Sequence, residues 1–159
     1  LRREAIRVLL QRAGEDPNLA EPAFEVFFEA RQKVIFFDDA MPALDFLKSK
    51  YPMVALSNGN ADVHKVGLGN YFVAAFNPIN LGVSKPDAKM FHAGAEALGV
   101  LPEEVLHIGD DPHMDVLGAQ RAGMQAVWLN RDQKQWAHEV QPAPYTVDSL
   151  KALCDAWPL

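Results

Sequence analysis

Three short segments of this chain carry side chains that could bind a phosphate group together with a metal ion. They are Ser57-Asn58-Gly59, Ser84-Lys85-Pro86, and Gly109-Asp110-Asp111 with Asp115. The last segment gathers three carboxylates, and Mg²⁺ prefers oxygen ligands while it shares its remaining positions with water and phosphate. The acidic segment therefore predicts a magnesium site and, with it, chemistry on a phosphate.

The other two segments offer groups that suit an anion. Ser57 supplies a hydroxyl, Asn58 an amide, and Gly59 a backbone that an anion can approach closely. Lys85 precedes Pro86, which favours the first turn of a helix, so its ammonium group should lie near the positive end of that helix. Each segment alone also has an ordinary interpretation, as a turn or as a solvated surface lysine.

The acidic segment leaves two roles open for its members. Asp110 stands directly at the end of an apolar run and is the best candidate for direct metal ligation. Asp111 and Asp115 either ligate the metal through water or anchor Lys85. The structural alternative is a helix N-cap with extra acidic residues in the first turn.

Short apolar runs alternate with helical patterns along most of the chain. Strands are expected at 53–56, 105–108 and 126–129, with a weaker one at 73–76. Helical patterns at 86–98 and 115–122 each end at a glycine, as helices often do. This alternation predicts an α/β fold with a doubly wound, Rossmann-like parallel sheet, in which ligands gather at the carboxyl ends of the strands.

Further helices and one strand are expected at the two ends of the chain. Amphipathic patterns at 1–13 and 21–33 predict a helical hairpin, and Asp39 is expected to cap a third helix that ends near residue 50. A turn at 142–144 should precede an edge strand at 145–147 and a last helix.

Composition excludes several classes of partner. The formal net charge is -6 and no cluster of Lys or Arg occurs, which argues against nucleic acid. No apolar stretch approaches the roughly 20 residues that cross a bilayer, so no membrane span is expected. The single cysteine, Cys154, favours a reducing compartment, and we expect a cytoplasmic protein.

In their order and spacing, the three segments resemble motifs II, III and IV of the haloacid dehalogenase-like hydrolases. The resemblance covers residues about 34 to 135 and is closest to bacterial phosphatases of flavin mononucleotide and of 5-amino-6-(5-phosphoribitylamino)uracil. It implies a Mg²⁺-dependent phosphomonoester hydrolase that acts on a small phosphorylated metabolite through an aspartyl-phosphate. Its implied site has two catalytic residues, further substrate-binding residues and a metal set. They are Lys85 and Ser57 as catalytic residues, Ser57, Asn58, Gly59 and Lys85 for substrate, and Asp110, Asp111 and Asp115 for Mg²⁺.

The first motif of that family, an N-terminal strand ending in Asp-x-Asp, does not occur in this chain. Asp38 and Asp39 are no substitute, because adjacent side chains leave a strand on opposite faces. We therefore expect residues 1–33 to be the C-terminal part of a helical cap and residues 34–159 to be a core that lacks its central first strand. The chain should be inactive and should hold Mg²⁺ weakly. The space left by the missing strand predicts that the chain derives from a longer parent protein, or that it dimerises or exchanges strands.

Two other functions fit parts of the same pattern. A non-catalytic relative that binds phosphate or a partner protein would need no nucleophile. A receiver-type signalling domain would also combine an acidic pair, Ser57 and Lys85, but the intervening Asp45 lies in a helical pattern.

Two further features have both a structural and a functional interpretation. Arg31 and Lys33, near the end of the second helix, could reach a substrate or could be solvated helix ends. Among the histidines, only His113 lies near the acidic loop, whereas His107 alternates with apolar strand residues as a core position.

Overall fold

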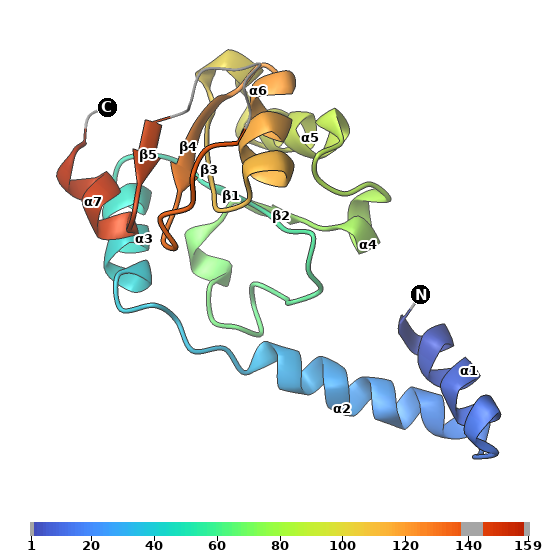
Figure 1. The fold of residues 1–159 in the computed structure, drawn as a ribbon. Coiled ribbons are helices and arrows are strands. Elements are labelled where there is room, and N and C mark those ends of the chain that lie inside the picture. The colour runs from blue at the N-terminus through green and yellow to red at the C-terminus, as the bar shows by residue number, and fades with distance from the viewer. Residues whose placement is uncertain (1, 138–144, 158–159) are drawn as a thin grey trace.

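Two small parallel sheets and the helices around them form the core of the protein (Figure 1). The computed structural model describes residues 2–137 and 145–157. Its strands are β1 (Val54–Leu56), β2 (Ala74–Phe76), β3 (Leu106–Gly109), β4 (Gln125–Leu129) and β5 (Tyr145–Val147). β1 pairs with β2, and β3 pairs with β4, which pairs with β5, all in parallel. The predicted α/β class with parallel strands is confirmed.

Apolar side chains from helices and strands meet in two clusters. α5 (Ala88–Leu98) packs against β1 and β2 and supplies the fully buried Phe91 to the first cluster. The second cluster combines Val127 and Val147 of the strands with Leu153 of α7 (Leu150–Asp155), and α7 also packs on α3 (Ala40–Lys48). The two clusters fix the carboxyl ends of β1 and β3, which the candidate site uses.

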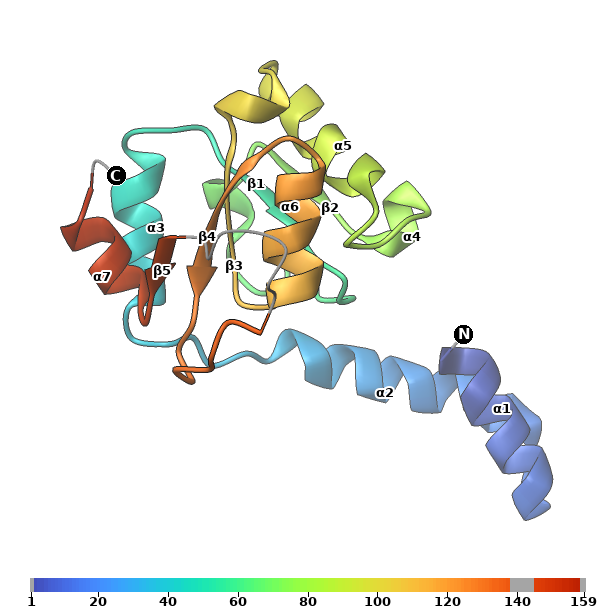
Figure 2. The ribbon, with the colours of Figure 1, turned by 45° about the horizontal axis from the view of Figure 1, so that its top comes forward.

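A helical hairpin projects from this core. α1 (Arg2–Ala13) packs on α2 (Ala20–Gln32), and both views show the pair extending away from the sheets (Figures 1 and 2). Gly14 follows α1 with a φ of 74°, the left-handed conformation that ends helices at glycine. The hairpin agrees with the two helices expected near the N-terminus, and none of the described helices is long and apolar enough to cross a membrane.

The strands do not form one continuous sheet, because β1 and β3 are not hydrogen-bonded to each other. A cavity of about 1170 Å³ is lined by β1 on one side and β3 on the other, together with apolar residues of α3 such as Leu44 and Leu47. Among the described residues, β1 and β3 each therefore have one backbone edge without a strand partner, beside a largely apolar space.

Some expected elements differ from the observed ones. The helix expected at 115–122 is a π-helical turn over Pro112–Leu117 followed by the short helix α6 (Gly118–Arg121). A short helix, α4 (Pro78–Leu81), was not predicted. The turn expected at 142–144 lies outside the described residues.

The expectation for Asp39 is confirmed for its position at the start of α3 and wrong for its side chain. Asp39 occupies the N-cap position of α3, but its side chain makes no cap hydrogen bond there. One carboxylate oxygen instead accepts a hydrogen bond from Arg131 at 2.8 Å, and the other accepts one from the backbone N–H of Leu150 at 2.8 Å. Asp39 therefore ties the segment before α3 to the start of α7.

Candidate functional site

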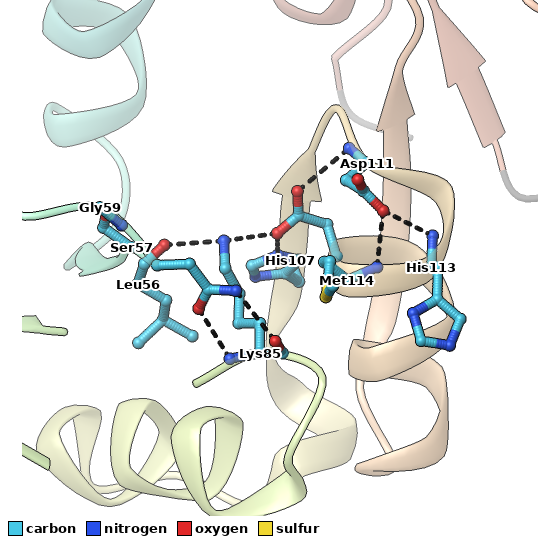
Figure 3. Close-up of polar contacts among 10 residues, drawn as sticks. Leu56, Ser57, Gly59, Lys85, His107, Asp111, His113 and Met114 are labelled. Carbon is cyan, nitrogen blue, oxygen red and sulfur yellow. Dashed lines mark hydrogen bonds and ion pairs between the residues drawn. The ribbon is translucent and has the colours of Figure 1, made fainter. Parts of the chain in front are cut away.

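Lys85 lies between the carboxyl ends of β1 and β3 (Figure 3). Its Nζ donates a hydrogen bond to the carbonyl oxygen of Leu56 at 2.9 Å and forms an ion pair with Asp115 Oδ1 at 2.6 Å. Only 12% of the Lys85 side chain and 6% of the Asp115 side chain are exposed. The ammonium group is thus fixed and largely shielded from water at the edge where parallel sheets bind ligands.

Asn58 holds the backbone of Lys85 rather than facing outward. Its Nδ2 donates to the Lys85 carbonyl oxygen at 2.9 Å, and its Oδ1 accepts from the Lys85 N–H at 2.7 Å. The Asn58 amide was expected to contact substrate, but both of its polar atoms already have protein partners. The geometry leaves the backbone N–H of Asn58 as its means of contact with an anion.

Ser57 and Gly59 form the turn at the end of β1. Ser57 Oγ accepts a hydrogen bond from the Gly59 N–H at 2.9 Å, which leaves the hydroxyl proton able to donate to a ligand. A Cβ atom on residue 59 would lie 3.2 Å from Ser57 Oγ, tighter than most such contacts. Glycine at this position therefore keeps the serine hydroxyl accessible.

The carboxylate of Asp115 organises the other side of the site. Besides Lys85, its Oδ1 lies 3.1 Å from His107 Nε2, and its Oδ2 accepts from the Asp111 N–H at 3.1 Å. Burial disfavours its charge, but the hydrogen bonds from His107 and Lys85 and the positive charge of Lys85 outweigh burial and hold the pKa of Asp115 well below its usual range. Asp115 therefore stays ionised and anchors Lys85.

His107 contributes to the site in a way that its strand pattern does not indicate. Its ring packs edge-on against Phe91, with 5.1 Å between ring centroids, which agrees with a core position. Its Nε2, however, faces the Asp115 carboxylate. A polar side chain within an apolar strand is the one sequence signal of this contact, and the strand pattern by itself predicts only a core position.

The three carboxylates of the acidic loop have separate surroundings. Asp111 caps the π-helical turn by accepting from the N–H groups of His113 and Met114 at 2.9 and 2.7 Å. Asp115 forms the ion pair with Lys85. Asp110, directly after β3, is exposed. Within residues 2–137 and 145–157, no group of three His, Cys, Asp or Glu residues is arranged to hold a metal ion.

The predicted metal set is thus divided, and Asp110 lies at the exposed end of β3. Its backbone is fixed from β4, because Trp128 Nε1 donates to the Asp110 carbonyl oxygen at 3.0 Å. A second carboxylate from across the β1–β3 cavity would complete a set of the kind that Mg²⁺ prefers. His113 contacts the loop through its backbone, and its ring points away from Lys85 (Figure 3).

Comparison with known proteins identifies the class to which this fold and site belong. Residues 1–123 match the family of haloacid dehalogenase-like hydrolases. The chain therefore belongs to the haloacid dehalogenase-like hydrolases.

Among its relatives is a phosphoserine phosphatase of Thermus thermophilus, 31% identical over 89% of this chain and 59% of that protein. The 5-amino-6-(5-phospho-D-ribitylamino)uracil phosphatase YigB of Escherichia coli is 40% identical over 69% of this chain and 46% of that protein. A 2-haloacid dehalogenase structure from Pseudomonas syringae superposes with a TM-score of 0.89 at 35% identity, over 97% of this chain and 68% of the other. The chain thus spans about half to three fifths of these two phosphatases.

Proposed function

We propose that the protein of which this chain is part hydrolyses small phosphomonoesters with the help of Mg²⁺. The observation that carries the proposal is the ammonium group of Lys85, held by Asp115 and by the Leu56 carbonyl beside the Ser57 turn. The two phosphatases among the relatives named above support the same class of substrate. A cytoplasmic location stays a prediction from the single cysteine.

The residues of this chain would supply the electrostatic half of the site. A phosphoryl group in transfer spreads negative charge over its oxygens, so cations and donors that are already in position stabilise the transition state more than the ground state. Lys85 would neutralise that charge, and the Ser57 hydroxyl with the backbone N–H group of Asn58 would orient the oxygens. Asp110 would help to hold Mg²⁺, which would add charge neutralisation when bound.

The nucleophile would come from a strand that is not part of this sequence. A strand inserted between β1 and β3 would pair with both free edges and would fill the apolar cavity, and its carboxyl end would lie beside Lys85. An aspartate at that end could attack phosphorus and displace the alcohol of the ester, which breaks the ester P–O bond and leaves an aspartyl-phosphate. Water would then hydrolyse this intermediate to inorganic phosphate and the free carboxylate. The helical hairpin of residues 1–33 would belong to a cap, and the chain by itself would be inactive. Without that strand, the open cavity would favour dimerisation or strand exchange.

Some relatives are named dehalogenases, and one observation favours a phosphate substrate over a halogenated acid. The exposed carboxylates of Asp110 and Asp111 would repel either anion by themselves, so an anion can bind beside them only with a cation, and a bound divalent cation attracts a phosphate dianion more strongly than a singly charged carboxylate. With Mg²⁺ on Asp110, the site would attract a phosphate dianion.

The test is hydrolysis of a generic aryl phosphate, with and without Mg²⁺, by the 159-residue chain and by a longer parent protein. Chloride release from a 2-haloacid is measured in parallel. We expect Mg²⁺-dependent phosphate release by the parent alone. A parent that binds Mg²⁺ but hydrolyses no phosphomonoester would support a non-catalytic relative, and release of chloride alone would support a dehalogenase.

A further inference from the structure

The last turn of α2 is fastened to the segment that follows β1. Gln32 Oε1 accepts a hydrogen bond from the Asp62 N–H at 2.8 Å, and its Nε2 donates to the Phe28 carbonyl at 3.0 Å. Lys65 forms an ion pair with Glu29 at 2.7 Å. Gln32 is only 8% exposed, so the hydrogen bond to Asp62 is a buried contact that fixes the helix end over this segment.

This contact directs Arg31 toward the Ser57 turn. A Cβ atom built on Gly59 would lie 3.8 Å from Arg31 Nη2 and 3.2 Å from Ser57 Oγ, so the guanidinium and the hydroxyl converge on one point. No ion pair or hydrogen bond formed by the described residues involves the Arg31 side chain. The nearest acidic group along the segment, Asp62, accepts instead from the N–H groups of His64 and Lys65.

A basic residue in the last turn of a helix also interacts favourably with the helix dipole, but that interaction needs no particular direction of the side chain. The unpaired guanidinium beside Ser57 has a more specific use. Guanidinium groups bind phosphate through two parallel hydrogen bonds, and arginine is favoured wherever such a group is recognised.

We infer that Arg31 is a substrate-binding residue that contacts the phosphate group of a phosphomonoester together with Ser57. The inference rests on the proposed function, and it adds a cation from the helical hairpin to the one that Lys85 supplies from the core. Substrate would then bridge α2 and the β1 turn, and the Gln32–Asp62 contact would set the distance between them.

The test is binding of inorganic phosphate to the 159-residue chain at low ionic strength, measured by NMR titration. Arg31→Ala should raise Kd about tenfold, and Arg31→Lys should restore part of the affinity because it keeps the charge but not the paired donors. Arg12→Ala, which removes the same side chain from the last turn of α1, is the matched control and should change Kd less than twofold. Ser57→Ala removes the hydroxyl of the turn after β1, and its Kd for phosphate tests that turn separately from Arg31.

The outcomes separate the inference from the proposed function. If Ser57→Ala weakens phosphate binding while Arg31→Ala behaves like Arg12→Ala, the role of Arg31 is refuted and the phosphate site stands. If the unmodified chain binds no phosphate in the titration, both the role of Arg31 and the phosphate site of the proposed function fail.

Discussion

Replacing Asp115 with asparagine removes the negative charge that faces both Lys85 and His107. Asparagine has nearly the same shape, so the substitution tests charge rather than packing. The Lys85 ammonium, 12% exposed, would lose its counter-ion while it stays largely shielded from water. Removing one partner of a buried ion pair typically costs about 3–5 kcal/mol. Because the amide oxygen of asparagine can still accept from Lys85, we expect a loss of about 3 kcal/mol, at the lower end of that range.

The effect of the Asp115→Asn substitution should also depend on pH. The pKa of Asp115 is lower in the folded chain than in the unfolded chain, so its ionised form stabilises the fold. That contribution is complete above the unfolded pKa of about 3.9 and is lost as the pH falls through the folded pKa. The difference in the free energy of unfolding between the two proteins should therefore be full at pH 7 and should narrow below about pH 4.

Urea unfolding followed by tryptophan fluorescence measures both quantities. The control is Asp132→Asn, because Asp132 forms an ion pair with Lys134 in which both side chains are mostly exposed, and it should leave the free energy of unfolding unchanged. A loss below about 1 kcal/mol for Asp115→Asn, or a loss that does not change between pH 7 and pH 3, would refute the buried ion pair as the anchor of Lys85.

Two further substitutions test contacts around the site. Asp39→Asn should lower the free energy of unfolding by about 1 kcal/mol at pH 7, because it weakens the contacts with Arg131 and with the Leu150 N–H. The hydrogen bond from Arg131 holds the pKa of Asp39 below its usual range, so urea unfolding should show this loss shrinking below about pH 4. Gly109→Ala should destabilise the chain by about 1–3 kcal/mol in thermal unfolding, because the added Cβ would lie 2.3 Å from Asp115 Cγ. An unchanged midpoint would mean that the acidic loop is not packed as described.

Much of the fold follows from patterns that are local in sequence. The strands at β1, β3 and β4 begin and end within one residue of their expected positions, because buried parallel strands are short apolar runs. The glycines after α5 and before β4 have the positive φ angles, 70° for Gly99 and 85° for Gly123, that helix ends favour. The three site loops follow from the same patterns, since each adjoins a strand end or a helix start.

Side-chain partners distant in sequence could not be predicted in this way. Asn58 is 27 positions from Lys85, and only the fold reveals that its amide clamps that backbone. Asp39 is 111 positions from Leu150, so the local capping rule places Asp39 at the start of α3 but cannot reveal that its side chain accepts from the Leu150 N–H. His107 fits an apolar strand by pattern, and its contact with Asp115 depends on the π-helical turn, which has the same apolar pattern as the α-helix expected there.

The separation of β1 from β3 also depends on more than local sequence patterns. The alternation of strands and helices predicts one continuous sheet. The structure instead has two sheets, β1–β2 and β3–β4–β5, because no described strand lies between β1 and β3 to pair with both. The absence of an Asp-x-Asp sequence is the basis on which a missing strand is expected, and that expectation stays a prediction. The structure shows an apolar cavity between β1 and β3.

The central claim is that Lys85 supplies the fixed positive charge of a phosphomonoester hydrolase site. Its most direct test is kcat for aryl phosphate hydrolysis by the longer parent protein with Lys85→Ala, compared with Lys89→Ala at an exposed position of α5. We expect Lys85→Ala to lower kcat about a thousandfold and Lys89→Ala to leave it unchanged. A Lys85→Ala protein that folds and keeps more than about a tenth of kcat would contradict the account.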